Sequence, residues 1–257
     1  MLLQITQNCN FHCTHCLHDC DMSEERYMTS NTLERALEFA DSIGSQTIII
    51  TGGEPSLHPK FEEFCRTIHQ AGFKFILTTN GWWITIPSHV FSIRRIARLT
   101  GCVGIQVTTD KRYYGDKYTL IKSHRVDFEK IPKCCPTFDV VDNLEDLGRA
   151  KKIFDDGYEA HTSPSCINPC LISKQVPYSS IGRSLEMRGK NCTPLVDWLG
   201  KVHASESCLC PALGDVFHLQ ELPKAFRDSK PCFKCRNSKY FLQNPNYEQA
   251  RKLLGIE

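Results

Sequence analysis

Short apolar runs alternate with amphipathic segments over the first 110 residues or so, and this alternation constrains the fold more than any other feature. The four runs are LLQIT, QTIIIT, FKFILTT and CVGIQVTT. Parallel strands joined by crossover helices produce such a pattern. Strand–helix units of this kind wind right-handedly into an open sheet or a barrel, and both place their working residues at the carboxyl ends of the strands. The sequence therefore predicts an α/β fold with functional motifs directly after the apolar runs.

Three of the intervening segments have the apolar spacing of helices. In NTLERALEFADSIG one face is apolar, Asn31 and Glu34 are placed to cap the start, and Gly44 is placed to end the helix. The segments KFEEFCRTIHQAG and SHVFSIRRIARLTG repeat this design. A fourth, weaker unit consists of TFDVVD as a strand and NLEDLGRAKKIFDDG as a helix.

The composition changes beyond this region. Residues from about 160 to 235 are rich in Cys, Pro, Ser and Gly, which bury little apolar surface, so bound metal is expected to order them. The tail NYEQARKLLGIE predicts a short helix. We therefore expect three parts: an α/β domain over 1–165, a cysteine-rich domain over 166–240 and a C-terminal helix over 241–257.

Charge and hydropathy exclude several classes of protein. The formal net charge is +2 over 257 residues and no dense basic patch stands out, so a nucleic-acid partner is not expected. No run of about 18 apolar residues occurs, and the opening MLLQITQNCN lacks the features of a signal peptide. We therefore expect a cytoplasmic protein without a membrane segment. In that compartment the 15 cysteines favour thiolate ligands for metal over disulfides.

Three of these cysteines, Cys9, Cys13 and Cys16, fall within eight positions after the first apolar run. Structural zinc usually takes four protein ligands, whereas this spacing supplies three. An iron–sulfur cube has four irons, so three cysteines would leave one iron open to another ligand. The spacing favours iron–sulfur, with zinc and a structural thiol cluster as alternatives. The histidines that could complete a zinc shell are His12, His15 and His18.

A second motif, Gly52-Gly53-Glu54-Pro55, directly follows QTIIIT. It places a backbone without bulky side chains and one carboxylate at a strand end, and glycine lets a ligand approach closely. Taken alone, the motif is typical of a simple turn. Its combination with the three cysteines favours a functional role.

The two motifs, CxxxCxxC after the first strand and GGEP after the second, resemble those of the radical S-adenosylmethionine (radical SAM) superfamily. The resemblance implies a partial (β/α)6 TIM-like barrel with a small C-terminal cysteine-rich extension. It implies that Cys9, Cys13 and Cys16 hold a [4Fe-4S] cluster whose open iron binds the amino and carboxylate groups of S-adenosylmethionine. It further implies that the segment from Gly52 to Pro55 contacts the methionyl amino group.

Two further strand ends carry polar residues that match the family. After FKFILTT, the sequence TNG resembles the TNG of the family, which implies that Thr79, Asn80 and Gly81 line the cofactor pocket; the alternative is a polar turn. After CVGIQVTT, Thr108 and Asp110 stand where the family has Ser-x-Asp, which implies hydrogen bonds to a ribose. Threonine in place of serine is a mild departure from the family pattern.

The chemistry of the family implies that an electron from an external donor, such as flavodoxin or ferredoxin, cleaves S-adenosylmethionine to a 5′-deoxyadenosyl radical. That radical removes hydrogen from an unactivated carbon, while the protein positions the reactants and excludes water. The resemblance therefore predicts an oxidoreductase.

A second group of cysteines lies near the C-terminus. A CxxC pair and two distant cysteines make a four-thiolate set, which suits zinc or an iron–sulfur cluster. The set resembles the twitch domain, a shortened relative of the SPASM extension, and this resemblance implies one auxiliary [4Fe-4S] cluster with a hairpin at DWLGKVHASESC. Cys208 matches the end of that hairpin better than Cys210 does. The four expected ligands are Cys192, Cys208, Cys232 and Cys235.

An auxiliary cluster in this family commonly accepts an electron from the substrate, so we expect an oxidation. A peptide is the first expectation for the substrate, with a separate peptide-recognition protein in place of an added domain of about 80 to 100 residues. A small carbohydrate or aminocyclitol alcohol is the alternative, because twitch enzymes of this length include such dehydrogenases. The alternative from another class is a noncatalytic iron–sulfur or zinc-binding regulatory module.

Overall fold

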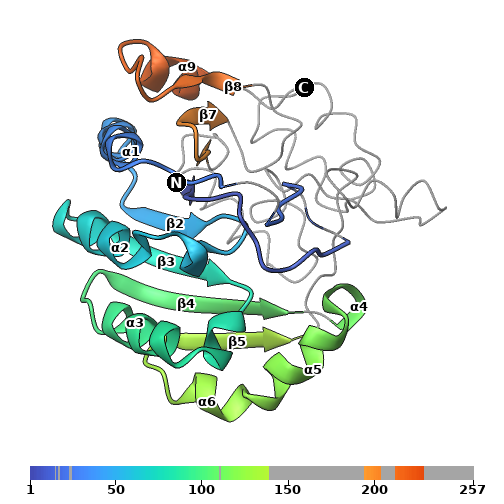
Figure 1. Ribbon diagram of the computed structural model, residues 1–257. Helices are drawn as coiled ribbons and strands as arrows, with labels where there is room; N and C mark the ends of the chain where they lie inside the picture. The colour runs from blue at the N-terminus through green and yellow to red at the C-terminus, as the bar shows by residue number, and fades with distance from the viewer. Residues whose placement is uncertain are drawn as a thin grey trace, which may run out of the picture.

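The structure, a computed structural model, describes most of the first 138 residues and two later segments. The described residues are 1–14, 16, 18–22, 25–109, 111–138, 194–203 and 212–228. Within them, eight strands form a single sheet, and helices pack against it (Figure 1). This mixed α/β architecture with a parallel sheet confirms the predicted fold class.

The strands follow the order β5-β4-β3-β2-β1-β6-β7-β8 across the sheet. β1 to β5 pair in parallel in sequence order, and β6 pairs in parallel with the other edge of β1. β7 and β8 continue the sheet in antiparallel fashion. The bounds are β1 Leu2–Gln4, β2 Thr47–Thr51, β3 Lys74–Thr79, β4 Cys102–Thr109, β5 Cys134–Phe138, β6 Leu195–Val196, β7 Lys201–His203 and β8 Ala212–Asp215.

Helices α1, α2 and α3 connect the first four strands and lie next to one another on one side of the sheet (Figure 1). Two 3-10 turns, η1 and η2, follow β2 and β3 directly, and α4 to α6 follow β4. The bounds are α1 Ser30–Ser42, η1 Pro55–Leu57, α2 Phe61–Gln70, η2 Trp82–Thr85, α3 Pro87–Ala97, α4 Lys111–Tyr114, α5 Asp116–Ser123, α6 Arg125–Glu129 and α9 Leu222–Asp228.

The core lies between the sheet and these helices. Every second residue of the central strands is fully buried, as expected where helices cover a sheet face. Burial of each such aliphatic or aromatic side chain stabilises the fold by about 1.5–3 kcal/mol. The strand residues with no exposed surface include Ile48, Ile50, Phe75, Leu77, Ile105 and Val107.

The predicted cap of α1 is wrong in its position. The helix begins at Ser30, so Asn31 and Glu34 lie inside its first turns and are exposed. The N-cap is Thr29, whose hydroxyl oxygen accepts the Thr32 backbone N–H at 3.1 Å. The predicted end is confirmed, because the helix stops at Ser42 and Gly44 adopts a φ of 69°.

The connection from β4 to β5 is where the sequence predicted least. α4, α5 and α6 were not predicted, because helices of four to eight residues show too few turns for a periodic pattern. The expected strand TFDVVD begins earlier than predicted: β5 starts at Cys134 and includes Thr137 and Phe138, and the rest of TFDVVD lies outside the described residues. The helix expected after it lies outside the described residues.

The later segment joins the same sheet. A tight turn at Asp197–Gly200 connects β6 to β7, inside the stretch predicted to form a hairpin. Gly200 has a φ of 88°, which suits glycine at the end of this turn. The expected boundaries at 165 and 240 lie outside the described residues. Among the helices that the structure describes, none is long and apolar enough to cross a membrane.

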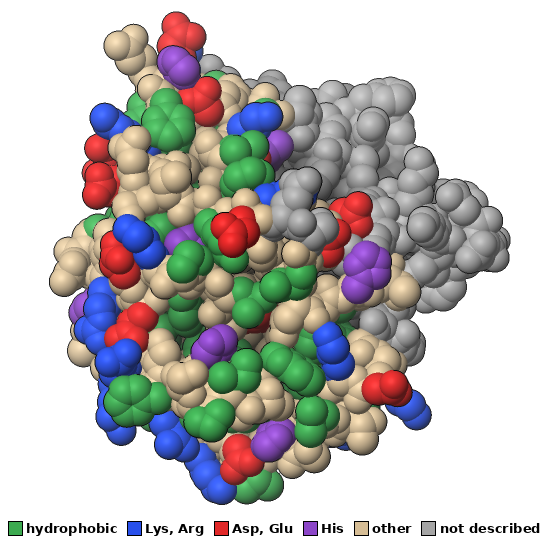
Figure 2. All heavy atoms as spheres, viewed as in Figure 1, with side chains coloured by type: hydrophobic (Ala, Val, Ile, Leu, Met, Phe, Trp, Pro, Cys, Tyr) green, Lys and Arg blue, Asp and Glu red, His purple; other side chains and the backbone are tan. Residues whose placement is uncertain are grey.

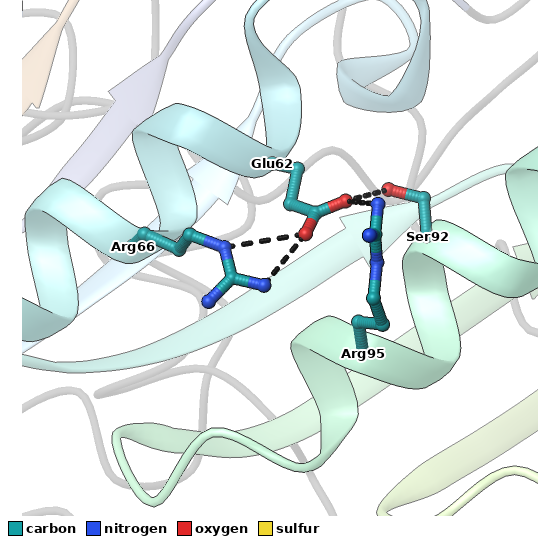
Figure 3. A network of polar contacts seen from close by, with 4 residues as sticks. All are labelled: Glu62, Arg66, Ser92 and Arg95. Atoms are coloured by element: carbon teal, nitrogen blue, oxygen red, sulfur yellow. Dashed lines mark hydrogen bonds and ion pairs between the residues drawn. The ribbon is translucent and has the colours of Figure 1, made fainter.

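The outer helices are joined by a polar network around Glu62 of α2 (Figure 3). One carboxylate oxygen of Glu62 accepts two hydrogen bonds from Arg66, at 2.7 and 3.2 Å. The other accepts from Ser92, at 2.9 Å, and from Arg95 of α3. Lys and Arg side chains gather on this side of the molecule (Figure 2), and the network ties α2 to α3 near the surface.

Candidate functional site

The predicted motifs meet at the carboxyl ends of β1, β2, β3 and β4. The pairing of β1 with β2 continues beyond both strands, because the Gly53 N–H donates to the Thr6 carbonyl at 2.9 Å. The Glu54 N–H donates to the Asn8 carbonyl at 2.8 Å. The GGEP segment is therefore hydrogen-bonded directly to the chain that leads into the cysteines.

The two glycines of this motif are required by that close approach. A Cβ atom on Gly53 would lie 2.3 Å from the Asn8 carbonyl oxygen and 2.8 Å from Cβ of Cys9. A Cβ atom on Gly52 would lie 2.7 Å from the Thr6 carbonyl oxygen. These separations are too short for any side chain, so the glycines let the GGEP segment after β2 lie against the start of the cysteine loop. Contact with a methionyl amino group stays a prediction.

The three cysteines of the first motif lie together in one loop. Cys9 is buried, and Cys13 and Cys16 are half-buried. Backbone N–H groups face two of the sulfurs: that of Phe11 donates to Sγ of Cys9 at 3.4 Å, and that of Cys20 to Sγ of Cys16 at 3.3 Å. Such donors stabilise thiolate ligands of a metal centre.

Burial is the main reason that the pKa of the Cys9 thiol is raised to about 12. The hydrogen bond from the Phe11 N–H lowers this pKa, whereas the charges of Glu54, Cys13 and Cys16 raise it further. A thiol of this kind is a poor nucleophile by itself. The charge of a bound metal deprotonates a coordinating thiol outright. The residues therefore fit a metal cluster better than nucleophilic catalysis by cysteine.

The Glu54 carboxylate is the polar centre of the site, and it is 1% exposed. Its Oε1 accepts from the backbone N–H and the hydroxyl of Ser56, at 3.1 and 2.6 Å. The Thr79 hydroxyl donates at 2.8–2.9 Å, and the Asn80 N–H donates to Oε2 at 2.8 Å. Burial raises the pKa of Glu54, and these hydrogen bonds oppose that effect. Glu54 thus joins the end of β2 to the end of β3.

Glu54→Gln is expected to destabilise the protein by about 1–3 kcal/mol, because the new amide NH2 would face a backbone N–H on either side, that of Ser56 or that of Asn80. A backbone N–H can only donate, so a buried donor would be left unsatisfied. The matched control is Glu62→Gln, which is expected to cost about 1 kcal/mol or less because that network is near solvent. Urea unfolding of both variants measures the difference. Equal losses would contradict the structural role of Glu54.

The stability that Glu62 contributes should depend on pH, and this supplies a second check on its network. Partial burial raises the pKa of Glu62, but hydrogen bonds from Arg66 and Ser92 and the charge of Arg95 lower it below its usual 4.5. A carboxyl group with a lowered folded-state pKa stabilises above its unfolded pKa, and this contribution is lost as the pH falls through the folded value. The stability difference between wild type and Glu62→Gln should therefore shrink below about pH 4.5.

Asn80 connects the β3 end to the cysteine loop. Its Nδ2 donates to Oδ1 of Asn10 at 2.9 Å, and its Oδ1 accepts the Trp82 backbone N–H at 2.9 Å. The Thr79 hydroxyl accepts the Trp83 indole N–H at 3.1 Å. Both residues are buried and tie the end of β3 to its neighbours, and their place in a cofactor pocket stays a prediction.

An aromatic group lines the mouth of the site, and the sequence did not predict it. The Phe11 ring meets the Trp82 and Tyr114 rings edge-on, with centroids 5.8 and 5.2 Å apart. The Lys117 ammonium lies 4.6 Å from the Phe11 ring centroid and donates to the Asn10 carbonyl. Phe11 lies between Cys9 and Cys13, and this position could have identified it as a site residue. Tyr114 and Lys117 had no such signal, because they lie in the helices α4 and α5 that the sequence did not predict.

Thr108 lies at this mouth. Burial raises the pKa of Tyr114, nearby Cys13 raises it further, and a hydrogen bond with Thr108 opposes the shift. A cavity of about 330 Å³ opens beside these residues. Asp110 lies outside the described residues, so hydrogen bonding to a ribose stays a prediction. The residues lining the cavity are Phe11, His12, Cys13, Tyr114, Asp116 and Lys117.

The β6–β7 hairpin lies beside the cysteine loop. Burial lowers the pKa of His18 to about 4, the charge of His203 lowers it further, and Asp197 opposes the shift. Nε2 of His203 is 3.6 Å from a carboxylate oxygen of Asp197, at the turn of the hairpin.

In the part of the chain that the structure describes, no three His, Cys, Asp or Glu residues form a group that could hold a single metal ion.

The family of the chain follows from comparison with known proteins. The model of the radical SAM superfamily matches residues 3–131, which contain both motifs and the strand ends just described. The chain belongs to the radical SAM superfamily. Enzymes of this superfamily use a [4Fe-4S] cluster and S-adenosylmethionine, so the predicted family and its principal cofactors are confirmed.

Curated relatives match over part of their length. A "putative glycyl-radical enzyme activating enzyme" of Methanocaldococcus jannaschii is 26% identical over 161 residues, which is 58% of this chain and 59% of the relative. A GTP 3′,8-cyclase of Haemophilus ducreyi is 35% identical over 94 residues, 35% of this chain and 28% of the relative. The chain therefore spans less than two thirds of either protein.

Two solved structures resemble this chain in fold. BtrN in complex with AdoMet and 2-DOIA gives a TM-score of 0.56 at 16% identity, covering 98% of this chain and 85% of BtrN. Streptococcus suis SuiB bound to S-adenosylmethionine gives 0.51 at 15% identity, covering 96% of this chain and 70% of SuiB. Both likenesses concern the fold, and they agree with the expected partial barrel.

Proposed function

We propose that this protein reductively cleaves S-adenosylmethionine to a 5′-deoxyadenosyl radical and uses it to take hydrogen from a carbon of its substrate. The observation that carries the proposal is that, in the loop that follows β1, Cys9 interacts with Cys13, Cys16 and the buried Glu54, and the Cys16 N–H donates to the Cys13 carbonyl. When bound, the [4Fe-4S] cluster supplies the electron for cleavage, and a flavodoxin or ferredoxin is the proposed external donor.

The residues of the chain have separate tasks in this proposal. Cys9, Cys13 and Cys16 hold the cluster. The buried contacts of Glu54 and Asn80 keep the cysteine loop in place against β2 and β3. The rings of Phe11, Trp82 and Tyr114 cover one side of the site and limit the entry of water.

The test is a single assay. Protein reconstituted with iron and sulfide without oxygen, then given dithionite and S-adenosylmethionine, should release 5′-deoxyadenosine. A noncatalytic iron–sulfur or zinc-binding module would bind metal and release none. Absence of 5′-deoxyadenosine from protein that holds a full cluster would overturn the proposal.

A peptide is the proposed substrate, and oxidation is the proposed outcome. The likeness in fold to SuiB, which is solved bound to precursor peptide SuiA, supports this choice. The likeness to BtrN, solved with 2-DOIA, supports the second candidate, a small carbohydrate or aminocyclitol alcohol. Mass spectrometry of candidate peptides encoded near the gene should find a product that has lost two hydrogen atoms. Oxidation of a small cyclic alcohol, with every peptide unchanged, would favour the second candidate.

The proposed auxiliary [4Fe-4S] cluster is held by Cys192, Cys208, Cys232 and Cys235 in the domain expected over 166–240. Cys235→Ala should lower the iron content and abolish product, while release of 5′-deoxyadenosine continues, because the first cluster is intact. Cys208→Ala should behave in the same way, and the matched control Cys210→Ala should resemble wild type. Unchanged iron in Cys235→Ala would contradict the auxiliary cluster.

A further inference from the structure

The Asn80 side chain reaches a sulfur atom of the cysteine loop. Its Nδ2 lies 3.8 Å from Sγ of Cys9, within the range of a hydrogen bond to sulfur, and both residues are buried. The same sulfur accepts the Phe11 backbone N–H at 3.4 Å. Cys9 is thus contacted by one donor from its own loop and by one from the end of β3, which is 71 residues away in sequence.

The surroundings fix which end of the Asn80 amide faces the sulfur. The Trp82 backbone N–H can only donate, and it is 2.9 Å from Oδ1 of Asn80, so the oxygen must point toward it. The amide nitrogen then points the other way. One of its hydrogens is used on Oδ1 of Asn10, at 2.9 Å, and the other is available for the Cys9 sulfur.

The position of the amide is fixed as well as its orientation. The backbone N–H of Asn80 donates to the buried Glu54 carboxylate at 2.8 Å, and Glu54 is also held by Thr79. The side chain therefore has little freedom to turn away. A donor held in this way costs little reorganisation when the charge on the sulfur changes.

The effect of such a donor on an iron–sulfur cluster follows from electrostatics. Reduction adds negative charge to the cluster, part of which resides on the ligand sulfurs. An N–H group aimed at one of these sulfurs stabilises the reduced form more than the oxidised form and raises the reduction potential. We propose that Asn80 is a positioning residue that sets the reduction potential of the cluster through this hydrogen bond to Cys9. The inference rests on the proposed function of the three cysteines.

The experiment measures the midpoint potential of the reconstituted cluster by redox titration with electron paramagnetic resonance, without S-adenosylmethionine. Asn80→Ala removes the donor. Asn80→Asp keeps the shape and the acceptor for Trp82 but places a carboxylate oxygen toward the sulfur. Both substitutions should make the equilibrium constant for one-electron reduction about tenfold smaller. This corresponds to a midpoint potential that is more negative by about 59 mV.

The matched control is Asn10→Ala. It also removes a carboxamide beside Cys9 and also breaks the contact between Asn10 and Asn80, but it leaves the donor to the sulfur in place. Its equilibrium constant for one-electron reduction should stay within about twofold of the wild-type value. An equal shift in Asn10→Ala, or unchanged potentials in both Asn80 variants at full iron content, would overturn the role of Asn80. A wild-type protein that assembles no cluster would instead overturn the proposed function.

Discussion

Cys16→Ala is expected to abolish release of 5′-deoxyadenosine, with a fall of more than about hundredfold in rate. Changes to groups that only support a metal ligand already cost about 10- to 100-fold, and Cys16 is a proposed ligand itself. The loss should be accompanied by lower iron content after reconstitution. The assay uses dithionite as the electron source, so the result does not depend on which protein donor is present.

The matched control is Cys20→Ala, the same substitution four residues further along the loop. Cys20 is buried, and it contacts the Cys16 sulfur through its backbone N–H, which alanine retains. This variant should keep its iron and most of its activity. A result with the two variants reversed would show that the loop uses a different set of thiolates.

The helices α1 to α3 and the strands β2 to β4 were predictable because each buries one regular face. β1, whose three residues are all buried, was predictable as a short apolar run. Ile48 and Ile50 alternate along β2, and Phe64 and Ile68 repeat at helical spacing in α2, so hydrophobic periodicity reports both elements directly. The places of the motifs follow from the same pattern, because the carboxyl ends of parallel strands meet at one edge of the sheet.

The contacts that complete the site were not predictable from the sequence. Lys117 reaches Phe11 and the Asn10 carbonyl only through the three-dimensional path of the β4–β5 connection. Two partners of Glu54, Thr79 and Asn80, lie at the end of β3, 25 and 26 residues later in the sequence. No local pattern reports such pairs, since they depend on which strands become neighbours. The start of α1 at Ser30 was missed for a smaller reason: Thr29 and Asn31 are both good capping residues.

Gly53→Ala is expected to disrupt the site through a single methyl group. The new Cβ would lie 2.3 Å from the Asn8 carbonyl oxygen, which accepts the Glu54 N–H, and 2.8 Å from Cβ of Cys9. Relief of this overlap requires Asn8 to move, which breaks its hydrogen bond with the Glu54 N–H and displaces Cys9. Overpacking of this kind costs about 3 kcal/mol. We therefore expect lower stability in urea and poor iron incorporation.

The matched control for that variant is Gly104→Ala, the same substitution in β4. A Cβ atom there would have as its nearest neighbour Cγ2 of Ile76, at 3.9 Å, which is an ordinary contact. Alanine also loses less conformational freedom on folding than glycine, so this variant should be as stable as wild type or more stable by about 0.5–1 kcal/mol. Iron per chain and the urea midpoint are measured for both. A methyl group 2.3 Å from the Asn8 carbonyl oxygen cannot be accommodated without displacing Cys9. If Gly53→Ala matched Gly104→Ala in iron per chain and in urea midpoint, the cysteine loop could therefore not be packed against Gly53 as described.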